Sequence, residues 1–218
     1  MNPQITIQQA TATDKEFIIE SILEAEKSGT SLLSYSAIFN LSEKEFIGTL
    51  NNILDEDITG QELCLSGFLI AKVEGKNASA ICSWVEGEVG QSNMLKANTL
   101  MYFIGKEKFI AASESIMLLD EVSIPREEGA IQLECIYTKK EFRGLGLSKK
   151  LIAEHIAVHK KRRPDINKAQ IILMANNDSA VSAYEKAGFH IAIKKTANNP
   201  NVSNLLPGNS KLLMEKII

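Results

Sequence analysis

Cysteine is too scarce in this sequence to supply a disulfide framework. The three cysteines, Cys64, Cys82 and Cys135, are odd in number, far apart and set in apolar runs. Small secreted domains that depend on disulfides carry dense cysteines at regular spacings instead. We therefore predict three buried free thiols in a protein of a reducing compartment.

Long hydrophobic runs are also absent. No stretch reaches the roughly 18 continuous apolar residues that a membrane-spanning helix needs. The first ten residues, MNPQITIQQA, lack the cationic segment and apolar run of a secretory signal. We therefore expect a cytoplasmic protein with no membrane partner.

Neither sign of charge dominates the composition. The formal net charge is -3, so there is no domain-wide basic field of the kind that binds nucleic acid, and we expect no nucleic-acid partner. The chain is 44% hydrophobic and 23% charged, which is typical of a soluble globular protein. A length of 218 residues fits one domain, residues 1–218, with a substantial core.

The hydrophobic pattern predicts an α/β fold. Short apolar or alternating runs predict about six to seven strands, at residues 5–7, 63–73, 78–85, 133–138, 170–175, 189–194 and 211–218. Helical spacing predicts helices at residues 14–23, 43–54, 147–161 and 178–187, with a loop or broken helix at residues 26–36. Strands and helices in this order indicate a sheet of mixed direction with helices on both faces.

One segment is too long to be a plain connection. Residues 87–129 separate two predicted strands and carry methionine, phenylalanine, leucine and isoleucine at mostly helical spacing. We predict two short helices here, inserted at about residues 88–129 before the central strand.

The most informative stretch is residues 133–150, LECIYTKKEFRGLGLSKK. An apolar run ends at a charged turn, and a turn with Gly144 and Gly146 precedes a helical pattern. Backbone N–H groups at the start of a helix have no partner inside it and bind anions, most often phosphate. A side chain at either glycine would keep the backbone away from a phosphate oxygen. A plain strand-to-helix turn is the alternative interpretation.

Two motifs resemble those of the GNAT superfamily of N-acetyltransferases. The glycine turn resembles the Q/R-x-x-G-x-G/A motif for acetyl-CoA, although Glu141 stands where glutamine or arginine is usual. Residues 177–189 match the motif N-x-x-A-x-x-x-Y-x-K-x-G-F without departure, and residues 213–217 are similar to the last strand of the family. The resemblance implies a three-layer GNAT-like fold with a twisted, mostly antiparallel sheet.

The resemblance also implies a binding site for acetyl-CoA. Backbone groups of Ile136, Tyr137 and Thr138 would pair with the pantetheine arm as an added strand does. The residues that would hold the pyrophosphate through N–H groups are Arg143, Gly144, Leu145, Gly146, Leu147 and Ser148. Asn177 is a candidate contact to the arm, or simply the N-cap of the helix that follows.

For catalysis, the resemblance implies that Tyr184 donates a proton to the departing sulfur. A tyrosine on an amphipathic helix can also be a core residue. The N–H of Ile136 is the candidate for stabilising the oxyanion. Glu134 is the candidate base, because an alkyl amine has a pKa of about 10 and must lose a proton; the alternative is an ordinary strand glutamate that faces a cation.

The expected function is therefore transfer of an acetyl group from acetyl-CoA to a primary amine, by direct attack in a ternary complex. We expect a small-molecule acceptor and a monomer or homodimer. An acyl-CoA-binding sensor and an acetyltransferase for protein N-termini or lysines remain alternatives. His155 and His159 are four residues apart on a predicted helix, but no third ligand is evident, so we predict no metal site.

Overall fold

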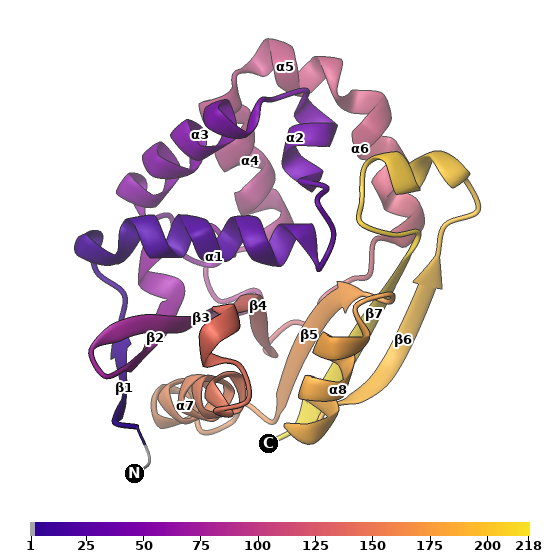
Figure 1. The fold of residues 1–218 in the computed structure, drawn as a ribbon. Coiled ribbons are helices and arrows are strands. Elements are labelled where there is room, and N and C mark those ends of the chain that lie inside the picture. The colour runs from indigo at the N-terminus through magenta and orange to yellow at the C-terminus, as the bar shows by residue number, and fades with distance from the viewer. Residues whose placement is uncertain (1–2) are drawn as a thin grey trace.

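The computed structural model describes residues 3–218 and contains one seven-stranded sheet (Figure 1). The strands are β1 (Ile5–Gln9), β2 (Phe68–Val73), β3 (Lys76–Val85), β4 (Ile131–Thr138), β5 (Lys168–Met174), β6 (His190–Thr196) and β7 (Ser210–Ile217). Their order in the sheet is β1-β2-β3-β4-β5-β7-β6, and only β4 and β5 run parallel. The mixed, mostly antiparallel sheet is thus confirmed.

Helices cover both faces of the sheet. They are α1 (Lys15–Lys27), α2 (Ser34–Phe39), α3 (Glu43–Glu56), α4 (Ser92–Ile104), α5 (Lys106–Ala111), α6 (Ser113–Leu119), α7 (Leu147–Arg162) and α8 (Asp178–Lys186). Residues 63–67, predicted as strand, instead form a loop and a short 3-10 turn before β2.

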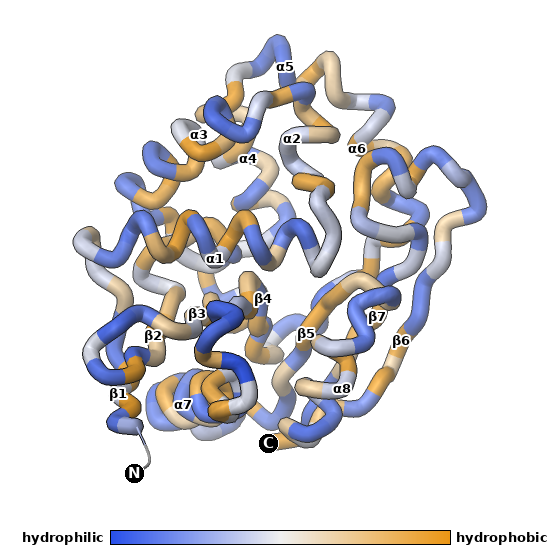
Figure 2. Tube along the Cα trace, viewed as in Figure 1, coloured by the Kyte–Doolittle hydropathy of each residue, from blue (hydrophilic) through white to orange (hydrophobic). Residues whose placement is uncertain are grey.

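Side chains of one strand alternate between two separate hydrophobic cores. Phe68 and Ile70 of β2 pack with helices α1 to α4, whereas Leu69 and Ala71 pack with α7 and α8. This follows from the period of two along a strand. Along α1 and α3, hydrophobic residues alternate with hydrophilic ones, as expected for helices with one buried face (Figure 2).

Helix α3 begins with a capping box, formed by Ser42 and, three residues later, Glu45. The Glu45 N–H donates to Ser42 Oγ at 3.2 Å, and the Ser42 N–H donates to Glu45 Oε2 at 2.8 Å. The break predicted at residues 26–36 is shorter than expected, because α1 continues to Lys27 and α2 begins at Ser34. Glu26 therefore lies in the last turn of α1.

The segment before the central strand holds three short helices rather than two. Gly105, with a φ of 96°, ends α4, and the chain bends again at Ala112 between α5 and α6. Helix α4 packs against α3 and buries Leu100 in the first core. None of the helices within residues 3–218 is both long and apolar enough to cross a membrane.

Strands β4 and β5 pair over only two positions and then separate. Their register holds at Ile131 with Ala169 and at Gln132 with Gln170. Beyond these pairs β4 carries a bulge, where the register with β3 shifts and Cys135 adopts a φ of 52°. The sheet is therefore open between β4 and β5 along the second half of β4.

Candidate active site

A cleft of about 1000 Å³ lies where β4 and β5 separate. Its walls come from both strands, the start of α7, helix α8 and the last turn of α1. All predicted site residues line it except Leu145, which lies at the exposed tip of the turn. Glu141 is exposed and also lies outside the cleft.

The second half of β4 presents backbone groups to this cleft that do not pair with β5. The Lys139 N–H donates to the Ala78 carbonyl, and Ser79 Oγ donates to the Tyr137 carbonyl, so residues 137 and 139 direct their backbone groups toward β3. Because these groups alternate along a strand, those of Ile136 and Thr138 point toward β5, which has already diverged. The Thr138 carbonyl accepts from Arg143 Nε at 3.3 Å. An extended ligand can therefore pair with this edge as a strand would.

The turn before α7 has the predicted geometry. Gly144 and Gly146 have φ values of 84° and 69°, a region that other residues rarely adopt. Leu147 is buried and anchors the first turn, and the first N–H with an acceptor in the helix is that of Lys150. Within residues 3–218, the N–H groups of residues 144–149 have no backbone acceptor outside the helix. Arg143 was predicted among these donors, but its N–H donates to the Lys140 carbonyl at 3.3 Å in the preceding turn.

Space at the turn is open. A Cβ atom built on Gly144 or Gly146 would meet no other atom within 4 Å. The free N–H groups, the positive end of the α7 dipole and this space together suit a diphosphate.

Tyr184 lies in the wall of the cleft, on the α8 face that meets the second core. It is only 7% exposed. Burial, with a smaller contribution from the charge of Glu134, raises the pKa of Tyr184 well above its ordinary value. Its hydroxyl therefore carries a proton at neutral pH, as a proton donor must.

Asn177 is the N-cap of α8, which confirms one of its two predicted roles. Its Oδ1 accepts from the Ala180 N–H at 3.3 Å, and its Nδ2 donates to Ser28 Oγ at 3.1 Å. The side chain thus joins α8 to the end of α1, on the border of the cleft.

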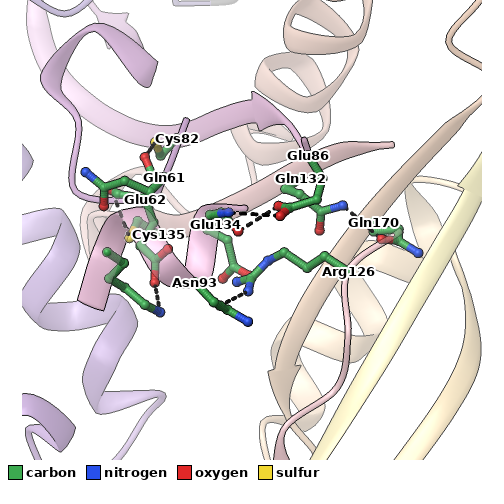
Figure 3. Close-up of polar contacts among 12 residues, drawn as sticks. Gln61, Glu62, Cys82, Glu86, Asn93, Arg126, Gln132, Glu134, Cys135 and Gln170 are labelled. Atoms are coloured by element: carbon green, nitrogen blue, oxygen red, sulfur yellow. Dashed lines mark hydrogen bonds and ion pairs between the residues drawn. The ribbon is translucent and has the colours of Figure 1, made fainter. Parts of the chain in front are cut away.

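Glu134 projects from β4 into a buried ion pair. Arg126 Nη2 donates to Glu134 Oε1 at 2.8 Å, while Nη1 donates to Asn93 Oδ1 at 2.9 Å (Figure 3). The guanidinium also lies 5.4 Å from the centre of the Trp84 ring. Burial raises the pKa of Glu134, and Arg126 opposes that rise.

Charged residues that no sequence motif indicates share this end of the cleft. They are Glu26 of α1, Glu62 of the loop before β2, Lys96 of α4 and Lys211 of β7. Burial alone would raise the pKa of Glu62, but Lys96 and Arg126 outweigh burial and lower it to about 2. Lys96 Nζ donates to Glu62 Oε1. Four separate segments supply these side chains, so no spacing along the chain could have found them.

The two helical histidines have polar partners on β3. Ser83 Oγ lies 2.7 Å from His155 Nδ1 and 2.8 Å from His159 Nε2. His155 Nε2 also lies 2.8 Å from the Ile81 carbonyl oxygen. Among residues 3–218, no group of three or more His, Cys, Asp or Glu side chains is arranged to hold a metal ion.

Cys135 lies at the β4 bulge beside the cleft. Burial, and then the charges of Glu62 and Glu134, raise the pKa of its thiol well above the ordinary value. A thiol that stays protonated is a poor nucleophile, which agrees with a packing role.

Comparison with protein families matches residues 82–202 to a family described as "Acetyltransferase (GNAT) domain". This match spans more than half of the chain and includes the glycine turn and the motif around Tyr184. A comparison with curated protein sequences finds no match.

Solved structures with the same fold are distant in sequence. An N-acetyltransferase from Staphylococcus aureus Mu50 is 17% identical, with a TM-score of 0.60 over 97% of this chain and 100% of that one. A ribosomal-protein-alanine N-acetyltransferase from Brucella melitensis is 15% identical, with a TM-score of 0.54 over 98% and 99%. An agmatine N-acetyltransferase is 11% identical, with a TM-score of 0.56 over 98% of this chain and 99% of that one. From the family match and this shared fold, the chain belongs to the GNAT family of acetyltransferases.

Proposed function

We propose that this protein transfers an acetyl group from acetyl-CoA to a primary amine. The observation that carries the proposal is the single cleft that joins the open edge of β4, the glycine turn of α7 and the buried Tyr184. The three features come from different elements, and each serves a different part of the same reaction.

Acetyl-CoA fits the residues along one side of this cleft. The backbone groups of residues 136–138 would bind the pantetheine arm as an added strand. The N–H groups of residues 144–148 would bind the pyrophosphate, with Asn177 beside the arm. The open space at Gly144 and Gly146 supports this assignment, because the phosphates need close approach to the backbone there.

Bound acetyl-CoA would supply the acetyl thioester that the amine attacks. The N–H of Ile136 faces the open side of β4 and would stabilise the oxyanion of the tetrahedral intermediate. Tyr184 would donate its proton to the sulfur as the carbon–sulfur bond breaks. The raised pKa of Tyr184 supports an acid that keeps its proton until that step.

A small amine is the favoured acceptor. Two of the similar structures are an agmatine N-acetyltransferase and a ribosomal-protein-alanine N-acetyltransferase, so the shared fold allows both classes of acceptor. In this chain the charged end of the cleft is enclosed, and Glu62 is only 8% exposed. An enclosed site suits a small molecule better than the surface lysine of a folded protein.

The test is release of free thiol from acetyl-CoA in the presence of an amine panel. The panel holds agmatine, spermidine, several amino acids and a peptide with an N-terminal alanine. We expect at least one amine to release CoA well above the rate without acceptor. Binding of acetyl-CoA without turnover of any amine would favour the sensor alternative, whereas turnover of the peptide alone would favour a protein acceptor.

A further inference from the structure

We propose that Glu26, at the end of α1, is the base that takes a proton from the incoming amine. This inference rests on the proposed function and replaces Glu134 in that role. Glu26 is the one carboxylate at the charged end of the cleft for which residues 3–218 provide no hydrogen-bonded cation.

One carboxylate oxygen of Glu26 is poorly satisfied by the protein. Its Oε2 atom is shielded from solvent and has no hydrogen-bond partner within residues 3–218. Glu62 Oε2, in the same cleft, is also buried and without a partner. A buried carboxylate oxygen without a donor is costly to the fold, so two of them in one cleft indicate that a ligand supplies the missing N–H groups.

The other carboxylates are already engaged by cations. Glu134 accepts from Arg126 at 2.8 Å, and Glu62 accepts from Lys96. A cation that holds a carboxylate opposes its protonation, because protonation would leave the cation unpaired in a buried site: this lowers the pKa of Glu62 to about 2 and counteracts the rise that burial causes at Glu134. Glu134 and Glu62 therefore suit positioning of the amine, and Glu26 suits acceptance of its proton.

The surroundings of Glu26 tune its basicity toward neutrality. Burial is the largest effect and raises the pKa of Glu26 to about 7, with Glu62 adding to the rise and Lys96 and Lys211 opposing it. The titratable or polar groups around it come from five other segments: Ser34, Tyr35, Glu62, Lys96, Cys135 and Lys211. A base is most effective when its pKa lies near the working pH.

The proton transfers balance over the whole reaction. An alkyl amine arrives as an ammonium, Glu26 accepts one N–H proton, and the freed lone pair forms the bond from nitrogen to the carbonyl carbon. As the carbon–sulfur bond breaks, Tyr184 gives its proton to sulfur, and a second N–H proton passes to the Tyr184 oxygen. Glu26 then releases its proton to solvent, leaving an amide, the CoA thiol and one proton.

The test compares three glutamine variants with the parent, using the best amine of the panel. The variants are Glu26→Gln, Glu134→Gln and, as a matched control, Glu16→Gln, which changes an exposed residue of α1 outside the cleft. The rate constant kcat/KM is measured from pH 5.5 to 9, with two amines of different pKa. Calorimetry of acetyl-CoA binding and thermal unfolding report cofactor binding and folding for each variant.

We expect Glu26→Gln to lower kcat/KM by about 100-fold or more. In the parent, kcat/KM should fall at acidic pH with a midpoint that is the same for both amines, and Glu26→Gln should lack this fall. Glu16→Gln should match the parent, and all variants should bind acetyl-CoA. If some amine turns over and Glu26→Gln keeps both the parent's kcat/KM and its fall at acidic pH, the inference is wrong and the proposed function stands. If only Glu134→Gln removes this fall in kcat/KM at acidic pH, Glu134 is the base.

A measurement without an acceptor separates the two proposals further. Carbon NMR of glutamate side-chain carboxyls in the free protein should show one signal that titrates near pH 7 and disappears in Glu26→Gln. A Glu26 signal that titrates near pH 4 would overturn the inference whatever the enzyme assays show. If no amine turns over at all, the proposed function itself fails.

Discussion

At the scale of single residues, contacts rather than residue type decide what the acidic side chains can do. Three glutamates share one end of the cleft, yet Glu62 and Glu134 accept from Lys96 and Arg126, while Glu26 has no hydrogen-bonded cation within residues 3–218. The same carboxyl group is thus held as a charge at Glu62, where two cations lower its pKa, and left able to gain a proton at Glu26, where burial raises it.

Tyr184→Phe should separate catalysis from cofactor binding. The change removes only the hydroxyl, so we expect kcat to fall by about 100-fold or more, with little change in the Kd for acetyl-CoA. Steady-state kinetics and calorimetry measure the two quantities. Tyr102→Phe is the matched control, since Tyr102 is 80% exposed on α4. Equal kcat values for Tyr184→Phe and the parent would exclude the proton-donor role.

At the scale of elements, the start of α7 would bind acetyl-CoA through its backbone, so we expect its glycines to matter for conformation and for space. Gly146→Ala places a methyl group in the open space and strains a residue with a φ of 69°. We expect a several-fold or greater rise in the KM for acetyl-CoA, together with a loss of stability of about 1 kcal/mol.

Gly75→Ala is the matched control for the glycine turn. Gly75 has a φ of 76° and equally open surroundings, but it lies in the turn between β2 and β3, away from the cleft. This variant should lose similar stability and keep the parent's KM. Similar KM values for both variants would refute binding of the diphosphate at the start of α7.

The packing of α7 on β3 should make the fold sensitive to acid. Burial lowers the pKa of His155 to about 3, whereas the unfolded chain has the ordinary value near 6.5. As pH falls below about 6.5 the unfolded state binds the proton first, so stability falls by up to roughly 1.4 kcal/mol per pH unit until the folded pKa is reached.

Urea unfolding between pH 7 and 4.5 tests this expectation. His155→Gln should reduce the pH dependence of the free energy of unfolding, whatever its effect at pH 7, and the part that remains includes His159, whose pKa burial lowers to about 4. His190→Gln, at an exposed position of β6, should keep the parent's dependence. An unchanged dependence in His155→Gln would show that other groups cause the acid sensitivity.

At the scale of the whole molecule, the two cores support different parts of the cleft. The core beneath α1, α2 and α3 supports the charged end, and the core beneath α7 and α8 supports the glycine turn and Tyr184. The sheet lies between them, so damage to one core should affect one part of the site more than the other.

Phe46→Ala and Leu151→Ala test this division. Both residues are fully buried, Phe46 in the first core and Leu151 in the second. We expect losses of unfolding free energy of roughly 3–5 and 2–5 kcal/mol, respectively. Only Leu151→Ala should weaken acetyl-CoA binding markedly, because α7 carries the turn. Equal weakening in both, measured by calorimetry on folded protein, would contradict the division.

The sequence alone determined the features that depend on neighbours along the chain. The glycines before α7, the capping box of Ser42 and Glu45, and the motif around Tyr184 are local, because turns, caps and helix faces are set within a few residues. The seven strands also followed from the hydrophobic pattern. The insertion was predicted as helical, but its third helix was missed, since the bends at Gly105 and Ala112 leave the apolar pattern continuous.

Only the tertiary structure decided how distant segments meet. The separation of β4 from β5 depends on strand register, and the neighbourhood of Glu26 depends on the packing of α1 against segments up to 185 positions away, such as Lys211. No pattern along the chain encodes these contacts, because each arises from burial of surfaces that lie far apart in sequence. The turn that suits the diphosphate is thus a local property of the chain, whereas the charges that would receive the amine are a product of the fold.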